Sequence, residues 1–111
     1  MTFLVSWLAL HRGGGEYVDV GFIARSPRGQ LRAFPLPGFE PSMAELIAVA
    51  DGAEPDRVPD IWDYLMERGM GTQSSFSDPA KVVAADFEAL AGKVMAQAGK
   101  VQHLAGEGAS G

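Results

Sequence analysis

Hydrophobic and polar residues alternate with the two-residue period of a β-strand in the first third of the chain. In residues 2–12 both alternating sets are largely apolar, which is typical of a strand that is central or covered by helices. The stretch from Glu16 to Gly38 predicts a hairpin, because residues 30–36 can pair back against the strand before them. The apolar positions expected on one face of that preceding strand are Val18, Val20, Phe22 and Ala24.

Turn residues separate these strands. Ser26-Pro27-Arg28-Gly29 places Pro at the second position of a turn and Gly last, where a left-handed backbone costs least. Gly13-Gly14-Gly15 predicts a flexible hairpin turn between the first and second strands. Prolines end sheet pairing after the third strand, because each lacks a backbone donor. They are Pro35, Pro37 and Pro41.

Three helices are predicted after the strands. Ser42-Met43-Ala44-Glu45 has the spacing of a capping box and predicts a helix to about Ala50. Asp60 is expected to cap a second helix, Ile61–Arg68, which Gly69 closes. Residues 71–77 are small and polar and predict a mobile connection.

A third helix is predicted to begin at Asp78-Pro79 and to reach about Leu104. Residues along it recur at spacings of four and three: Val83, Phe87, Leu90, Val94, Gln97, Val101 and Leu104. Such a helix would be about 39 Å long at 1.5 Å per residue, so it either packs across the sheet or overshoots it as a self-association surface. The candidate self-association residues are Phe87, Leu90, Val94 and Val101.

Together these elements predict an α+β fold in which a three-stranded antiparallel meander precedes three helices, the last one long and packed on the sheet. With 111 residues and 47% hydrophobic content, one domain is expected, spanning residues 1–105. Residues 106–111 predict a flexible tail. The chain has no cysteine and no apolar stretch long enough for a membrane span, so a cytoplasmic location is expected.

The net charge of −5 is unevenly distributed. Residues 1–38 carry four arginines and two acidic residues, a net charge of +2, whereas residues 39–111 carry five basic and twelve acidic residues, a net charge of −7. Within residues 40–67, eight acidic residues face Arg57 alone. Direct nucleic-acid binding is therefore not expected, because it needs a clustered cationic surface.

The second predicted helix combines acidic and aromatic residues. One interpretation is that the aromatic side chains belong to the core and the acids form a solvated face. The other is an acidic contact surface centred on aromatic residues, which concentrate binding energy when exposed. The candidate partner-binding residues are Asp56, Asp60, Trp62, Asp63, Tyr64 and Glu67.

No arrangement of residues predicts catalysis. Met43-Ala44-Glu45-Leu46, opening a helix after three strands, resembles the ribonuclease H arrangement, in which a Glu at this place helps to bind catalytic metal ions. That family places an Asp in its first strand, where this chain has Ser6-Trp7-Leu8-Ala9, so neither the activity nor a metal site is assigned to Glu45. No enzyme activity, cofactor or metal is expected.

The leading hypothesis is a non-enzymatic protein-binding module that presents an acidic surface to a protein partner. It would be a small subunit of an assembly or an inhibitor or immunity-type protein, and self-association is a further use of its last helix. One alternative is a small ligand-binding or enzymatic domain with an anion contact from Arg25 or Arg32. Another is an acidic mimic of nucleic acid.

Overall fold

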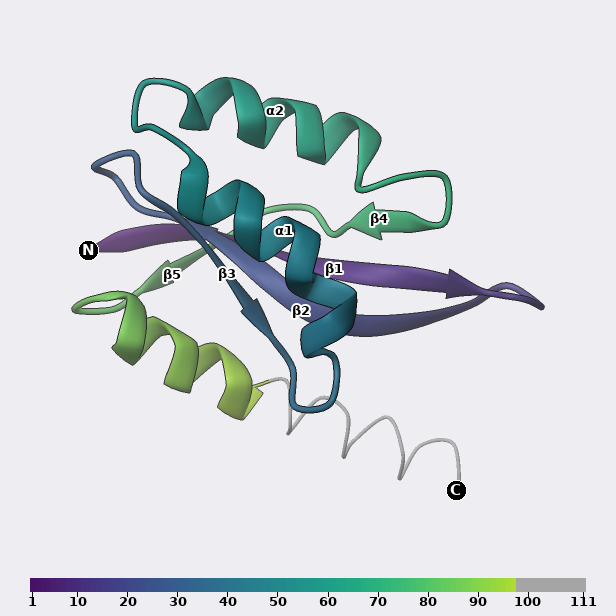
Figure 1. Ribbon diagram of the computed structural model, residues 1–111. Helices are drawn as coiled ribbons and strands as arrows, with labels where there is room; N and C mark the ends of the chain where they lie inside the picture. The colour runs from purple at the N-terminus through teal and green to yellow at the C-terminus, as the bar shows by residue number, and fades with distance from the viewer. Residues whose placement is uncertain (98–111) are drawn as a thin grey trace.

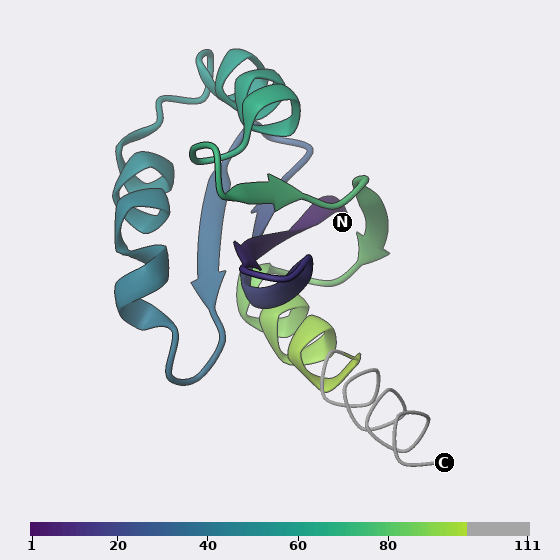
Figure 2. The same cartoon turned by 90° about the vertical axis from the view of Figure 1, so that its right-hand side faces the viewer.

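The computed structural model describes residues 1–97 and shows an antiparallel sheet with helices on both faces (Figure 1, Figure 2). The elements in chain order are β1 (Thr2–Arg12), β2 (Glu16–Arg25), β3 (Leu31–Pro35), α1 (Glu40–Gly52), α2 (Val58–Arg68), β4 (Ser74–Phe76), β5 (Ala80–Val83) and a C-terminal helix over residues 87–97. The predicted α+β class is confirmed, with an antiparallel sheet and three helices. The sheet has five strands rather than three, and two of them follow the first two helices.

The first three strands form the predicted meander, and the sheet order is β3-β2-β1-β4, with β5 also pairing with β1. Strand β1 therefore lies between two neighbours, as its two apolar faces predict. Its residues Leu8–Leu10 pair with β4, and Thr2–Val5 pair with β5. Both short strands thus occupy the same edge of β1, one after the other.

Ser77 connects β4 to β5 without leaving this edge. Its backbone N–H donates to the carbonyl oxygen of Trp7 at 2.9 Å, and its Oγ accepts from the Trp7 N–H at 2.9 Å. The buried Ser6 hydroxyl donates to the Ser77 carbonyl oxygen at 2.6 Å. These bonds satisfy polar groups at the point where the ladder is interrupted, so the expected mobile connection over residues 71–77 is wrong for its second half.

The predicted third helix begins later than expected. Residues 80–83 form β5, and the helix begins at residue 87, where the Asp86 carboxylate accepts from the Ala89 N–H at 2.8 Å. Val82 and Val83 are β-branched residues that suit a strand, and Pro79 is tolerated on a sheet edge. Val83 and Phe87 therefore belong to a strand and a helix, although their spacing of four residues predicts a single helix for both. The remainder of the prediction, from residue 98 to Leu104, and the tail at 106–111 lie outside the described residues.

A β-bulge overturns the expected face of β2. Leu8 pairs with Gly21 but Ala9 pairs with Asp19, so Val20 is the extra residue. Val20 consequently faces the same core as Ile23, whereas Phe22 and Ala24 face the opposite core. A strict two-residue period cannot predict this change of face, because the bulge is a property of the pairing between strands.

Each face of the sheet has its own core. On the α1 and α2 side, helix residues Met43, Leu46, Trp62 and Leu65 pack on strand residues that include Ile23. On the opposite side, Leu90 and Val94 of the C-terminal helix cover a cluster from the sheet: Phe3, Val5, Phe22 and Ala24. Burial on both faces accounts for the mixed apolar pattern of β1.

The predicted turns are confirmed. The Gly29 N–H donates to the Ser26 carbonyl oxygen at 3.1 Å, and Gly29 has φ +84°, the left-handed conformation that its position requires. Gly14 and Gly15 of the first hairpin also have positive φ, at +85° and +81°.

The predicted helix starts are each three residues too late. Helix α1 begins at Glu40 after Phe39, with Pro41 in its first turn and no side-chain cap, so Ser42 lies inside the helix. Helix α2 begins at Val58, which places Asp60 in its first turn, where a carboxylate still favours the helix dipole. In both helices a Pro in the first turn marks the start better than the capping pattern does. Gly69 ends α2 with φ +69°, as predicted.

Candidate functional site

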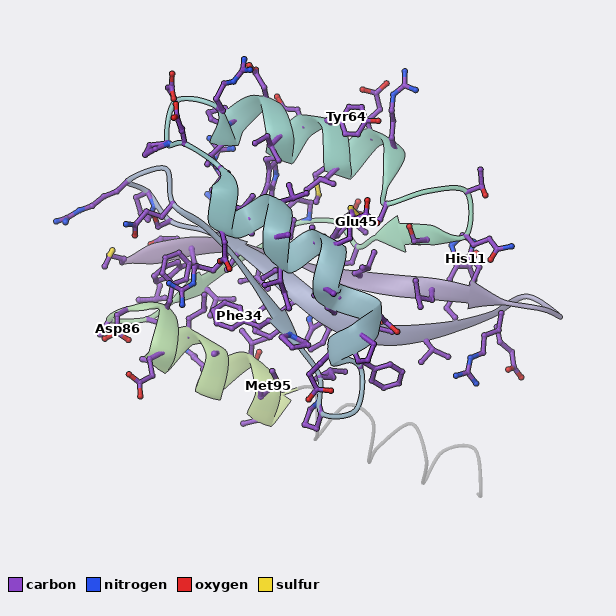
Figure 3. The ribbon with its side chains drawn as sticks, in the orientation of Figure 1. His11, Phe34, Glu45, Tyr64, Asp86 and Met95 are labelled. Carbon is purple, nitrogen blue, oxygen red and sulfur yellow. The ribbon has the colours of Figure 1, made fainter. Side chains whose placement is uncertain are left out.

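Four acidic residues form one stripe along α2 and the turn before it. Residues 56, 60, 63 and 67 are spaced by four, three and four, and this spacing places them on one side of a helix. All four side chains are exposed: Asp56, Asp60, Asp63 and Glu67. We call these residues the acidic stripe. Tyr64, which projects from α2 (Figure 3), is adjacent to this stripe by helical spacing and is 60% exposed.

Trp62 differs from the other candidate residues of α2. Its side chain is only 4% exposed and packs in the core with Val58 and Leu65. The spacing of these three residues by four and three defines the buried side of α2, opposite the acidic stripe. Trp62 therefore anchors α2 in the core, and Tyr64 is the exposed aromatic residue of this helix.

A groove of about 850 Å³ lies beside the acidic stripe, between α1 and α2. Glu45 and Val49 line it from α1 (Figure 3 shows Glu45), and α2 with the loop after it supplies the other wall. The lining residues from α2 and the loop include Arg57, Asp60, Ile61, Tyr64, Leu65, Arg68 and Met70. The Arg68 guanidinium carbon lies over the Tyr64 ring, 5.8 Å from its centre, which is within the range of a cation–π contact.

Charge around the groove is uneven. Within it, Glu45 and Asp60 balance Arg57 and Arg68. Outside it, the helical layer remains acidic, because the other six acidic residues of positions 40–67 are also exposed. The groove thus has no formal net charge and adjoins a negative surface on α2.

Sequence reasoning missed the α1 wall and the two arginines. Val49 is 37% exposed although it is apolar, and it lies off the buried stripe of α1 formed by Met43, Leu46 and Ala50. An apolar residue on the polar side of a predicted helix was the available signal. Arg57 and Arg68 gave no comparable signal, since their place in the groove depends on how α1 and α2 lie on the sheet.

Two of the four candidate self-association residues lie inside the protein. Leu90 is 0% exposed and Val94 is 3% exposed, and both pack on the sheet. Phe87 is half-buried, with its ring centre 5.0 Å from that of Phe3. Val101 lies outside the described residues. Self-association through this helix would therefore need surfaces other than Leu90 and Val94.

The two sheet arginines do not converge on one site. Arg32 pairs with Ala24 and shares its face, and the Arg32 guanidinium lies 5.6 Å from the centre of the Phe87 ring. Arg25 pairs with Leu31, whose side chain belongs to the opposite core. An anion held jointly by Arg25 and Arg32 is therefore not supported by their placement.

His11 has neighbours that its sequence position does not suggest. Its Nε2 lies 3.1 Å from the Ser75 hydroxyl, and its ring makes an edge contact with the Tyr17 ring at 4.4 Å between centres. These contacts join β4 to the end of the β1–β2 hairpin. Among residues 1–97, no group of three or more His, Asp or Glu side chains is placed to hold a metal ion.

Comparisons with protein-family models, with curated proteins and with solved structures found no match to this chain. In the described part of the chain, no helix combines the length and the apolar character that crossing a membrane requires.

Proposed function

We propose that this protein is a non-enzymatic protein-binding module that presents the acidic stripe of α2 and the exposed Tyr64 to a basic surface of a partner protein. The observation that carries this proposal is the alignment of Asp56, Asp60, Asp63 and Glu67 on one side of the helix, directly beside an aromatic ring that is 60% exposed. In complex with that partner, this chain acts as a small subunit of an assembly or as an inhibitor of the protein that it binds.

The two parts of this surface have different roles. Exposed charges individually contribute little to affinity, but a row of like charges accelerates association with an oppositely charged surface. Tyr64 supplies apolar area and a hydroxyl group, and aromatic residues of this kind carry much of the binding energy at interfaces. The rigid support for both is the buried side of α2, which Trp62 and Leu65 hold in the core.

A charge-matched pair of triple variants tests this proposal. D60N/D63N/E67Q removes three charges from the candidate surface, and E16Q/D19N/E88Q removes three exposed charges from other elements. Each variant would be immobilised and used to capture proteins from cells of the source organism at low and high salt. We expect a partner that wild type and the control retain at low salt, that D60N/D63N/E67Q loses, and that high salt releases.

Equal capture by both triple variants would contradict the proposal, because the location of the charges would then have no effect. If duplex DNA competes with this chain for the captured partner, the chain acts as an acidic mimic of nucleic acid. Such a partner would use one basic surface for both the acidic stripe and DNA.

A further inference from the structure

The groove between α1 and α2 has apolar character that the acidic stripe does not explain. Among the described residues, five large hydrophobic side chains are exposed, and two of them, Val49 and Tyr64, line this groove. Ile61 and Met70 are partly buried in it, and Leu65 is buried. An apolar strip with one wall on each helix is thus available next to the acidic surface.

The shape and charge of the groove restrict what it can hold. One side is α1 and the other is α2 with the loop after it, and the balanced charges of Glu45, Asp60, Arg57 and Arg68 leave no formal net charge inside. The groove follows α2 from Arg57 to Arg68, which is about 16 Å along a helix axis, or three helical turns. A third helix is the element that fills such a space, because the side chains of one helix pack into the grooves between others.

We propose, on the basis of the proposed function above, that this groove receives an amphipathic helix of the partner protein. Its apolar stripe packs against Val49, Ile61 and Tyr64, and Lys or Arg residues along one flank lie against the acidic stripe. The opposite flank lies toward α1. This protein therefore recognises a partner helix that is apolar on one face and basic along one flank, and positive charge alone is not sufficient for binding.

The charge distribution gives this helix a preferred orientation. Asp63 and Glu67 lie on the outer side of α2, whereas Arg57 and Arg68 line the groove, so basic residues are favoured on the outer flank. A basic residue placed in the middle of the apolar stripe would meet the positive charge of Arg68, which lies over the Tyr64 ring. Two arginines inside the groove thus act against helices with cationic residues on the packing face.

Three fluorescent peptides of equal length test this inference. The first is a Leu-Lys helix with Leu at i, i+3, i+4 and i+7 and Lys on one flank. The second has the same composition in scrambled order, and the third replaces Lys by Glu in the first. Anisotropy titrations would use wild type, V49S/Y64S in the groove, and Y17S as a control, since Tyr17 is 64% exposed and lies outside the groove.

We expect the ordered Leu-Lys peptide to bind wild type and Y17S at least tenfold more tightly than the scrambled peptide, and the Glu peptide not to bind. V49S/Y64S should lose that tenfold preference and keep its weak affinity for the scrambled peptide. Amide chemical shifts should change at residues 45–49 and 57–70 when the ordered peptide is added.

The failures are distinguishable. Equal affinity for ordered and scrambled Lys peptides would overturn the groove inference and leave the acidic surface of the proposed function in place. An ordered preference that V49S/Y64S retains would also overturn the inference, because the peptide would then lie elsewhere. If neither Lys peptide binds at low salt, the proposed acidic surface fails as well.

Discussion

Gly21 is the position where the structure predicts the largest effect of one added methyl group. The residue lies in β2 next to the bulge, beneath α1. A Cβ atom at this position would lie 2.6 Å from Cε and 2.9 Å from Sδ of Met43 and would collide with the carbonyl oxygen of Phe34. The Met43 side chain can change rotamer, but the Phe34 carbonyl belongs to the backbone of β3 and has no such freedom.

The expected loss of stability in Gly21→Ala is at the upper end of the range for overpacking, about 3 kcal/mol. For a domain of this size, such a change corresponds to a decrease in melting temperature of about 12–24 °C. Thermal and urea unfolding, followed by tryptophan fluorescence, would measure this loss of stability, since Trp62 of α2 is buried in the core. Gly52→Ala is the matched control, because an added Cβ at Gly52 meets no atom within 4 Å.

A double-mutant cycle separates the two collisions. Met43→Ala alone should destabilise the protein by about 2–5 kcal/mol, because its side chain is fully buried. The G21A/M43A variant should be less destabilised than the sum of the single variants, since Met43→Ala removes one of the two collisions. A Gly21→Ala variant within about 0.5 kcal/mol of wild type would refute the described approach of α1 to the sheet.

Three further predictions concern the C-terminal helix. Gly92→Ala should raise stability by about 0.5–1 kcal/mol, because an added Cβ at this helical position meets no atom within 4 Å. A lower stability of this variant in urea unfolding would instead reveal a close neighbour. Asp86→Ala should lower stability by about 0.5–2 kcal/mol through loss of the bond from the Ala89 N–H at 2.8 Å, and Asp86→Asn should retain most of it. Leu90→Ala should cost about 2–5 kcal/mol without changing the mass measured by light scattering; a lower mass at unchanged stability would instead indicate an assembly contact.

The elements that could be predicted from the sequence are those with local causes. The presence of strands β1–β3 and the turn at Ser26–Gly29 depend on neighbouring residues, and both were predicted correctly, although the bulge at Val20 changed the face of β2. The strands β4 and β5 depend on the free edge of β1, about 70 residues earlier in the chain, as the bonds between Ser77 and Trp7 show. Nothing in the small polar segment around Ser75 indicates pairing, so its strand could not be predicted.

The same distinction applies to the candidate site. The acids of α2 and their exposure follow from helical spacing, and Val58, Trp62 and Leu65 mark its buried side. The groove depends on where α1 and α2 lie on the sheet, which tertiary packing decides. Tyr64 and Val49 come together through that packing, so a surface that combines charge with an apolar strip could not be predicted from either helix alone.

Site-specific photo-crosslinking compares two exposed tyrosines and tests the central claim most directly. A benzophenone amino acid would replace Tyr64, beside the acidic stripe, or Tyr17, on the β1–β2 hairpin; these residues are 60% and 64% exposed. After illumination in cells of the source organism, we predict a discrete crosslinked protein from position 64 that position 17 does not yield and that D60N/D63N/E67Q abolishes. A discrete product from position 17 alone, or the same product from both positions, would contradict the assignment of the α2 surface as the partner-binding site.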